Sequence, residues 1–492
     1  MRGAASFVFS LVIGLSATGC QPNAAIRNIA QTCAAVDADG ANCAAFSLEQ
    51  DPVPDPKHNH PDQSFLLGFV EFDDQGKPYN RDQITTLFDR IEMEAQYRDL
   101  CIIVFVHGWK HNDAVRDSNV IQFRRLLQQV AQMERERPPG RYWPTRKVVG
   151  IYVGWRGLSF GAGDLGQDLT FWTRMATAHR VAVGSVREVL ARAKSLRDAI
   201  DATSWPGHQD PRNTRLVTIG HSFGGLIVYT ALSQYFIDSV VHSDTAAFSR
   251  SLAPRRSMAD QNKDREIAGY GDLVVVVNPA IEAMRYQSLS ELLDRRRAAS
   301  FAPRQNPVFV EVTSTADWAT GIAFPLGRSV NTTFESFTSE GERDEARAAL
   351  GHFPAFWTHD LKGPTPEADP NATPTVNVWQ ECADFNAFNA GQRPNGYLIP
   401  GWQRRYRAGA VLTHRASSEY DPNDPFWIIL TDQSMIRGHS DIEEPVFIDF
   451  VRQVYDDLVR LKESEPCEDV PKPPSSRGSS EALPTRILTR EI

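Results

Sequence analysis

Short apolar runs that alternate with helix-like segments constrain the fold of this chain most strongly. A run that is apolar at every position is typical of a strand buried on both faces of a sheet. Most of the runs are followed by a segment with helical spacing of apolar residues. Strands alternating with helices predict an α/β protein, with a mostly parallel central sheet and helices on both faces. LCIIVFV (100–106) is apolar throughout, and the other runs, which are mainly apolar, are KVVGIYVGW (147–155), RLVTIG (215–220), DLVVVVNPA (272–280), VFVEVTS (308–314) and FWIILTD (426–432).

The spacing of these runs divides the 492 residues into a core and an insertion. The alternating pattern covers 65–325 and 425–465. Between them lie 326–424, far more residues than the few expected in a connection between a strand and a helix. Their irregularly spaced aromatic residues predict an insertion with its own packing. Because the insertion enters before the last strand, we expect it to cover or border the binding pocket of the core. Residues 401–417 are expected to add a strand beside the last one. Residues 466–492 have the composition of a disordered tail.

The N-terminus, MRGAASFVFSLVIGLSATGC, has the layout of an export signal. Its apolar stretch is shorter than the roughly 20 residues that a membrane-spanning helix needs. The layout resembles a bacterial lipoprotein signal, although Ala17 stands where that family usually has leucine. The resemblance implies removal of residues 1–19, a lipid on Cys20 and attachment to a bacterial membrane, at the outer membrane or the periplasmic side. Ordinary secretion and a buried N-terminal helix are the alternatives. Residues 20–64 are polar and without apolar periodicity, which predicts a flexible tether between anchor and body.

Charge argues against a nucleic-acid partner. The chain has 52 basic and 61 acidic residues, a formal net charge of −9, and no basic run dense enough to form a nucleic-acid groove. Electrostatic attraction to an anionic lipid surface is not expected either. Membrane attachment would therefore depend on the acyl chains at Cys20.

Five cysteines remain after the signal, and their positions agree with export. Cys101 opens an apolar run and is expected to be a buried thiol. Cys33 with Cys43, and Cys382 with Cys467, are expected to form disulfides in an oxidising compartment. No CxxC pair is present in the sequence, which argues against a structural zinc site.

The segment RLVTIGHSFGGLIVYT (215–230) carries the strongest chemical signal. Gly220, His221, Ser222 and Gly224 belong to a G-x-S-x-G motif between a buried strand and a helix, which is the context of a nucleophile elbow. Glycine on either side of the serine allows a very tight turn and a strained serine that projects beyond the sheet. A structural glycine turn is the alternative, but the context favours Ser222 as a nucleophile.

With FVHGW (105–109), an aspartate after VFVEVTS and a histidine in GHSDI (438–442), the chain resembles the α/β-hydrolase superfamily, serine esterases and lipases in particular. The resemblance covers about 65–325 and 425–462. It implies a catalytic triad in the chain order serine, acid, histidine. It also implies an oxyanion hole formed by the amides of Trp109 and Phe223.

The other two members of the triad follow from position in the chain. His439 lies in a short loop between the last strand and the last helix, where its ring can reach Ser222. Asp317 follows VFVEVTS, where the family places its acid, and can orient the histidine. Asp432 and Glu282 are the competing acids.

No metal ion or organic cofactor is implied. His58, His60 and Asp62 are potential ligands, but they stand in a proline-rich segment and are interpreted as a solvated loop. His107 and His111 are four residues apart on a strand end and a loop, so a zinc pair is less favoured than a loop-stabilising role for His107.

These observations predict a serine hydrolase that cleaves a small-molecule or lipid acyl ester through an acyl-enzyme. Thioester or amide hydrolysis by the same triad is an alternative, because the fold hosts several chemistries. A non-catalytic, membrane-tethered binding module on the same scaffold is the rival of a different class.

Overall fold

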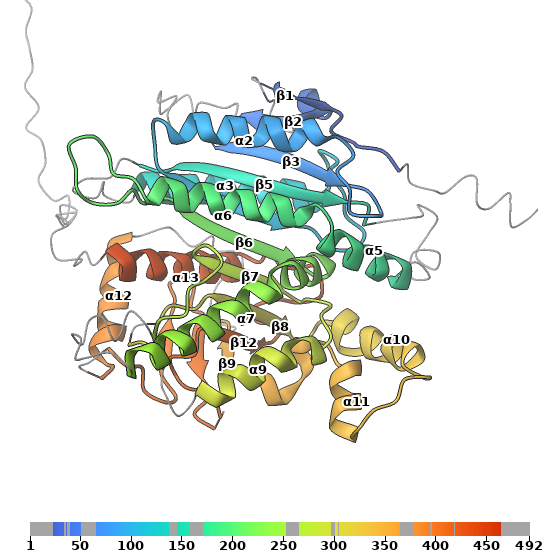
Figure 1. Cartoon of the computed structure of the whole chain (residues 1–492), viewed down its shortest axis with the longest axis vertical. Helices are drawn as coiled ribbons and strands as arrows, with labels where there is room; N and C mark the ends of the chain where they lie inside the picture. Colours follow the sequence, from blue (N-terminus) through green and yellow to red (C-terminus); the bar gives the residue numbers. More distant parts are fainter. Residues whose placement is uncertain are drawn as a thin grey trace, which may run out of the picture.

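A computed structural model describes most of the chain (Figure 1). The described residues are 23–33, 36, 40–50, 65–136, 145–157, 171–251, 265–296, 301–303, 305–364, 378–393, 396–417 and 419–463. The expected signal at 1–19, Cys20 and the expected tail at 466–492 lie outside them. No helix in the described part is long and apolar enough to cross a bilayer.

The described strands form one mostly parallel sheet, in the order β1-β2-β3-β5-β4-β6-β7-β8-β12-β9-β11-β10. The eight neighbours from β3 to β9 all run parallel, and antiparallel pairs occur only toward the two edges. The expected α/β class and mostly parallel sheet are therefore confirmed. The strands are β1 Ile29–Cys33, β2 Phe46–Gln50, β3 Leu66–Phe72, β4 Leu100–Val106, β5 Lys147–Trp155, β6 Arg215–His221, β7 Leu273–Val277, β8 Phe309–Ser314, β9 His359–Lys362, β10 Gln403–Arg405, β11 Val411–His414 and β12 Phe426–Thr431.

Helices cover both faces of the sheet, as expected (Figure 1). Alternate residues of one strand point to opposite faces, so Ile102 and Val104 of β4 join one core while Ile103 and Phe105 join the other. The first core is covered by α2 Arg81–Ala95, α5 Phe171–Val183, α6 Val186–Asp201, α7 Phe223–Ser251 and α9 Met284–Arg296; the second by α3 Ser118–Glu136 and α13 Pro445–Glu463. The other described helices are η1 Ala41–Cys43, the π-helix η3 Ala319–Ala323, α10 Phe324–Asn331, α11 Glu340–Arg347, η4 Leu350–His352, η5 Pro354–Phe356 and α12 Val378–Ala390.

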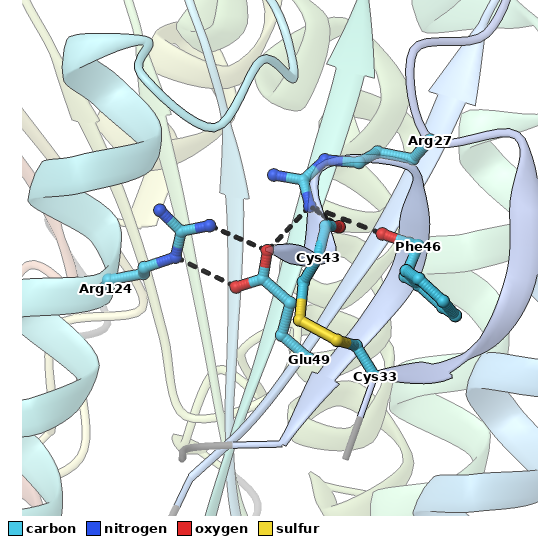
Figure 2. Close-up of a disulfide and its surroundings, with 6 residues drawn as sticks. All are labelled: Arg27, Cys33, Cys43, Phe46, Glu49 and Arg124. Carbon is cyan, nitrogen blue, oxygen red and sulfur yellow. Dashed lines mark hydrogen bonds and ion pairs between the residues drawn. A yellow bond between two sulfur atoms is a disulfide. The ribbon is translucent and has the colours of Figure 1, made fainter. Parts of the chain in front are cut away.

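The segment expected to be a flexible tether, 20–64, is in part a folded edge of the sheet. β2 pairs antiparallel with β3, and β1 pairs with β2. Glu49 of β2 binds the buried Arg27 at 2.6 Å and Arg124 of α3 at 2.7 Å, as Figure 2 shows. The prediction was wrong for the described residues because these charged groups neutralise one another, so a polar sequence can be buried. Residues 51–64 lie outside the described part.

The cysteines behave as expected where they are described. Cys33 and Cys43 form the disulfide drawn in Figure 2 and close the loop between β1 and β2. Cys101 is a buried thiol outside any disulfide, and its Sγ lies 3.4 Å from the Tyr455 hydroxyl. Cys382 is also disulfide-bonded, but its expected partner, Cys467, lies outside the described residues.

The insertion at 326–424 does not form a separate layer with its own packing. β9, β11 and β10 extend the main sheet beyond β12, so β9 and not the expected strand at 401–417 pairs with the last strand. The first part of the insertion, through η4, borders the ends of the strands that carry the site: the Leu350 amide donates to the Ile281 carbonyl, and His352 contacts Thr320. The end of β9 also borders the loop after β12, because Lys362 bonds Asp432. The described part of the insertion therefore borders the site, which is one of the two positions expected from the sequence.

Candidate active site

Ser222 occupies the tight turn between β6 and α7. Its φ is 55°, a left-handed value that is uncommon for residues other than glycine. A Cβ on Gly224 would lie 1.9 Å from the Val106 carbonyl oxygen, and one on Gly220 would lie 2.7 Å from the Gly224 carbonyl oxygen. Glycine at these two positions therefore lets the first turn of α7 approach the ends of β4 and β6. This is the strand–turn–helix geometry that the motif predicts.

His439 connects Ser222 to Asp317. Its Nε2 lies 2.7 Å from Ser222 Oγ, and its Nδ1 lies 2.9 Å from Asp317 Oδ2. A carboxylate can only accept a hydrogen bond, so Nδ1 carries the proton and Nε2 is left to accept the serine hydroxyl. The structure thus brings together the three side chains that the sequence predicts as a triad, from three loops at the carboxyl ends of β6, β8 and β12.

The surroundings of Asp317 keep it ionised. Burial alone would raise the pKa of Asp317, but hydrogen bonds from His439 and Thr320 outweigh burial and hold this pKa below its ordinary value. Asp317 Oδ1 accepts the amides of Ala319, at 2.9 Å, and Thr320, at 3.2 Å, while Oδ2 accepts the Thr320 hydroxyl as well as His439. Both carboxylate oxygens are therefore fixed in direction.

His352 supports the Asp317 carboxylate indirectly, through the Thr320 hydroxyl. Its Nε2 lies 3.0 Å from Thr320 Oγ1. Because the Thr320 hydroxyl donates its proton to Asp317, His352 Nε2 must be the donor to Thr320. The hydrogen bonds thus form a chain from His352 through Thr320 to Asp317.

The competing acids are bound elsewhere. Asp432 accepts a hydrogen bond from Lys362 at 2.6 Å and from Ser434. Glu282 is bonded to Arg285 and lies 3.6 Å from Arg328. Neither makes the contact with His439 that Asp317 makes.

The loop expected to supply an oxyanion donor lies beside the serine. A Cβ on Gly108 would lie only 2.8 Å from Ser222 Cβ, so the peptide that leads to Trp109 passes next to Ser222. Phe223, the source of the other expected amide, is the first residue of α7 and its ring is buried. The loop that leads to Trp109 and the first residue of α7 therefore both adjoin Ser222, as residues that supply oxyanion-hole amides must.

His107 holds this loop in place, as the sequence favoured. Its Nδ1 donates to the Gly108 carbonyl at 2.8 Å, and its Nε2 accepts the Trp155 amide at 3.1 Å. Burial lowers the pKa of His107 to about 4, so the ring is neutral near pH 7 and can accept at Nε2. His111 is instead bound to Asp117 at 3.1 Å.

Three further residues position the His439 loop. His221 Nε2 donates to the His439 carbonyl at 2.8 Å, and burial lowers the pKa of His221 to about 3, so this ring is neutral. Asn278 donates to the same carbonyl at 3.1 Å and to that of Gly438 at 3.2 Å. Ser314 donates to the Ile436 carbonyl at 2.7 Å and its amide binds Asn278 Oδ1 at 3.0 Å.

Sequence reasoning missed the roles of Asn278, Ser314, Thr320 and His352, and assigned His221 only to the turn. A signal for two of them exists: Asn278 and Ser314 are polar residues at the carboxyl ends of the buried strands β7 and β8. Loops at that edge of a parallel sheet form the binding crevice. Thr320 and His352 lie in connections without a comparable pattern.

The residues at the site indicate acid–base and nucleophilic chemistry. Within the described residues no group of three or more His, Cys, Asp or Glu side chains is arranged to hold a metal ion. His58, His60 and Asp62 lie outside the described part. A neutral histidine that accepts from a serine hydroxyl and is oriented by a carboxylate can activate that hydroxyl for attack.

Comparison with known proteins adds no family to this description. No protein-family model, curated protein or solved structure matches the chain. The function of the site must therefore be inferred from its own geometry.

Proposed function

We propose that this protein is a serine hydrolase that cleaves acyl esters through an acyl-enzyme intermediate. The observation that carries the proposal is the position of His439, within hydrogen-bond distance of both Ser222 Oγ and Asp317 Oδ2. Ser222 and Asp317 are 95 positions apart in the chain, and Asp317 and His439 are 122 positions apart. A turn whose glycines served only the fold would not need hydrogen bonds that connect three such distant loops.

The proposed mechanism follows from the hydrogen bonds. Ser222 Oγ attacks the acyl carbonyl while His439 Nε2 takes its proton, and the amides of Trp109 and Phe223 stabilise the oxyanion. His439 then donates the proton to the leaving alcohol. A water molecule, deprotonated by His439, attacks the acyl-enzyme, and His439 returns this proton to Ser222 Oγ as the acid leaves. Asp317 stays ionised and stabilises the imidazolium in both halves of the reaction.

The arrangement also supports the finer assignment of the fold to the α/β-hydrolase type. The elbow follows β6 in the middle of the parallel sheet, and the acid and the histidine follow β8 and β12. Ester hydrolysis is favoured because the resemblance is to esterases and lipases. A thioesterase or an amidase would use the same residues, so these remain alternative leaving-group chemistries.

Labelling with a fluorophosphonate separates a hydrolase from a binding module. We expect the probe to phosphonylate Ser222, because His439 makes its hydroxyl nucleophilic, and the Ser222→Ala variant to remain unlabelled by mass spectrometry. Ser233→Ala, which makes the same substitution further along α7, should be labelled like the wild type. An unlabelled wild type would favour the non-catalytic binding module.

A second experiment tests the proposed lipid anchor. We expect Cys20→Ser to move the protein from the membrane fraction to the soluble fraction, because acyl chains and not charge would hold it there. Intact-mass analysis of the wild-type protein should show an acyl modification on an N-terminal cysteine. A mature chain that begins beyond Cys20, or one without acyl mass, would contradict the anchor.

A further inference from the structure

An exposed apolar stripe begins next to the catalytic aspartate. Its members are spaced four residues apart, from the residue after Asp317 through η3 and α10. Within η3 and α10, residues at this spacing are neighbours on the helix surface, and Phe334 follows shortly after α10 ends. The exposed fractions are 64% for Trp318, 50% for Ile322, 65% for Leu326, 73% for Val330 and 98% for Phe334. Monomeric soluble proteins seldom expose an apolar row of this length, and such rows mark contact surfaces.

The opposite side of the same helices packs against the body, so the stripe is a defined face. Thr320 and Phe324 are buried, and Thr320 binds Asp317. A Cβ on Gly327 would overlap the Trp172 ring of α5, so α10 lies directly on α5. The stripe is therefore held rigidly beside the site.

The described chain begins at the same edge of the sheet. Asn23 lies 2.5 Å from the Tyr79 hydroxyl, and the next residues line a cavity with Arg156 and Gly157, just past the end of β5. A Cβ on Gly157 would lie 2.9 Å from the carbonyl oxygen of Gly108, the residue that abuts Ser222. Figure 1 shows this dark blue start of the described chain and α10 on the side toward which the arrowheads of β5 and β6 point.

The length of chain before Asn23 limits where an anchor can lie. Cys20 is three residues away, and three residues span at most about 11 Å. Because the segment after Asn23 is fixed on the sheet, the lipid on Cys20 would hold the active-site edge, and no other face, near the bilayer. The stripe at that edge would then meet the membrane surface.

We infer that the stripe formed by Trp318, Ile322, Leu326, Val330 and Phe334 docks on the bilayer that carries the Cys20 anchor, and that the substrate is an acyl ester of a membrane lipid. The inference rests on the proposed hydrolase function and on acylation of Cys20. With a net charge of −9, the contact is apolar and does not depend on anionic headgroups. Docking presents the open side of the triad to ester groups at the bilayer surface.

Flotation with phosphatidylcholine vesicles tests the docking in the mature chain, residues 20–492, carrying Cys20→Ser, where neither an acyl chain nor the apolar stretch before Cys20 can contribute. We expect this protein to float with the vesicles. The double variant Leu326→Asp/Val330→Asp should lower the ratio of bound to free protein by at least about tenfold. The single variant Phe334→Asp should also lower this ratio, and it should fold normally because Phe334 is almost fully exposed. The matched control is Tyr97→Asp: Tyr97 is 75% exposed but precedes β4, at the opposite edge of the sheet, and its variant should bind unchanged.

Two readouts separate this inference from the proposed function. The first readout is the ratio of the rate on a lipid ester in vesicles to the rate on a soluble short-chain nitrophenyl ester. This ratio should fall in the stripe variants and stay constant in Tyr97→Asp. Soluble-ester hydrolysis that does not depend on Ser222 would defeat the hydrolase proposal, whatever the flotation result. Equal flotation of all variants would overturn the docking. The docking would also be overturned if the parent protein did not bind vesicles and sedimented as a dimer while a stripe variant sedimented as a monomer. That result would assign the stripe to contact with a second copy of the chain.

Discussion

Ser222→Ala and His439→Ala should each lower kcat on a simple soluble ester by about 10⁶-fold, and the double variant should be no worse than either single one. The effects are not additive because the serine is a nucleophile only while the histidine accepts its proton, across the 2.7 Å contact. Rates measured under substrate saturation, beside thermal unfolding curves that show the variants are folded, check this. A Ser222→Ala rate equal to that of the wild type would overturn the assignment of the site.

Asp317→Asn should be milder, with a loss of roughly 10³- to 10⁴-fold, and the structure gives a specific reason. Two amides donate to Asp317 Oδ1, so an asparagine must keep its carbonyl oxygen there. Its NH₂ group then faces His439 Nδ1 and donates to it. The histidine is forced to carry its proton on Nε2, where it cannot accept from Ser222. If Asp432→Asn lowered the rate by a similar factor and Asp317→Asn had little effect, Asp432 and not Asp317 would be the acid of the triad.

The central part of the fold and the triad were accessible from sequence because each has a pattern longer than one residue. β4 at 100–106 is apolar throughout, and β6 at 215–221 is a mainly apolar run that ends at the turn. Ser222 stands in a motif with glycines that the geometry requires at both flanks. His439 and Asp317 were identified by their order after particular strands, which the parallel topology converts into proximity.

The edges of the sheet carried no such pattern. β1 reads IAQTC and β2 reads FSLEQ, too short and too polar for periodicity to be recognised. Arg27 and Glu49 are charged yet almost completely buried, because each finds its partner in a segment distant in sequence. Tertiary pairing of this kind overrides local preference. The same reason explains β9 to β11, strands of three or four residues: β12 offers an edge to β9, β9 offers one to β11, and β11 offers one to β10.

The positioning residues were missed for a different reason. Asn278 and His221 act on a backbone carbonyl of the His439 loop, so their effect depends on where that loop lies and not on any residue type within it. A single polar residue at a strand end is compatible with many roles. The structure is needed to show that both converge on the carbonyl of His439.

Glu311 should make the protein less stable as the pH rises through the neutral range. It lies in the middle of β8 with no exposed surface, Thr313 is a hydrogen-bond partner of its Oε1, and its Oε2 has no partner within the described residues. Burial raises the pKa of Glu311 from an ordinary value of about 4.5 to about 8. The folded protein therefore keeps a proton that the unfolded chain has already released. The stability that this proton contributes is complete below pH 4.5 and is lost as the pH rises to about 8.

Glu311→Gln keeps the shape of the side chain and removes its ionisation, so its free energy of unfolding should lack this fall. Relative to the variant, the wild type should lose about 1.4 kcal/mol for each pH unit across the interval. Urea unfolding at pH 5, 6.5 and 8 measures the difference, and the two proteins should diverge most at pH 8. Glu92→Gln, at an exposed position on α2, should give a pH profile parallel to that of the wild type. Parallel profiles for Glu311→Gln as well would mean that the buried carboxyl does not hold its proton at neutral pH, and that the unpartnered Oε2 is stabilised by a contact other than a proton.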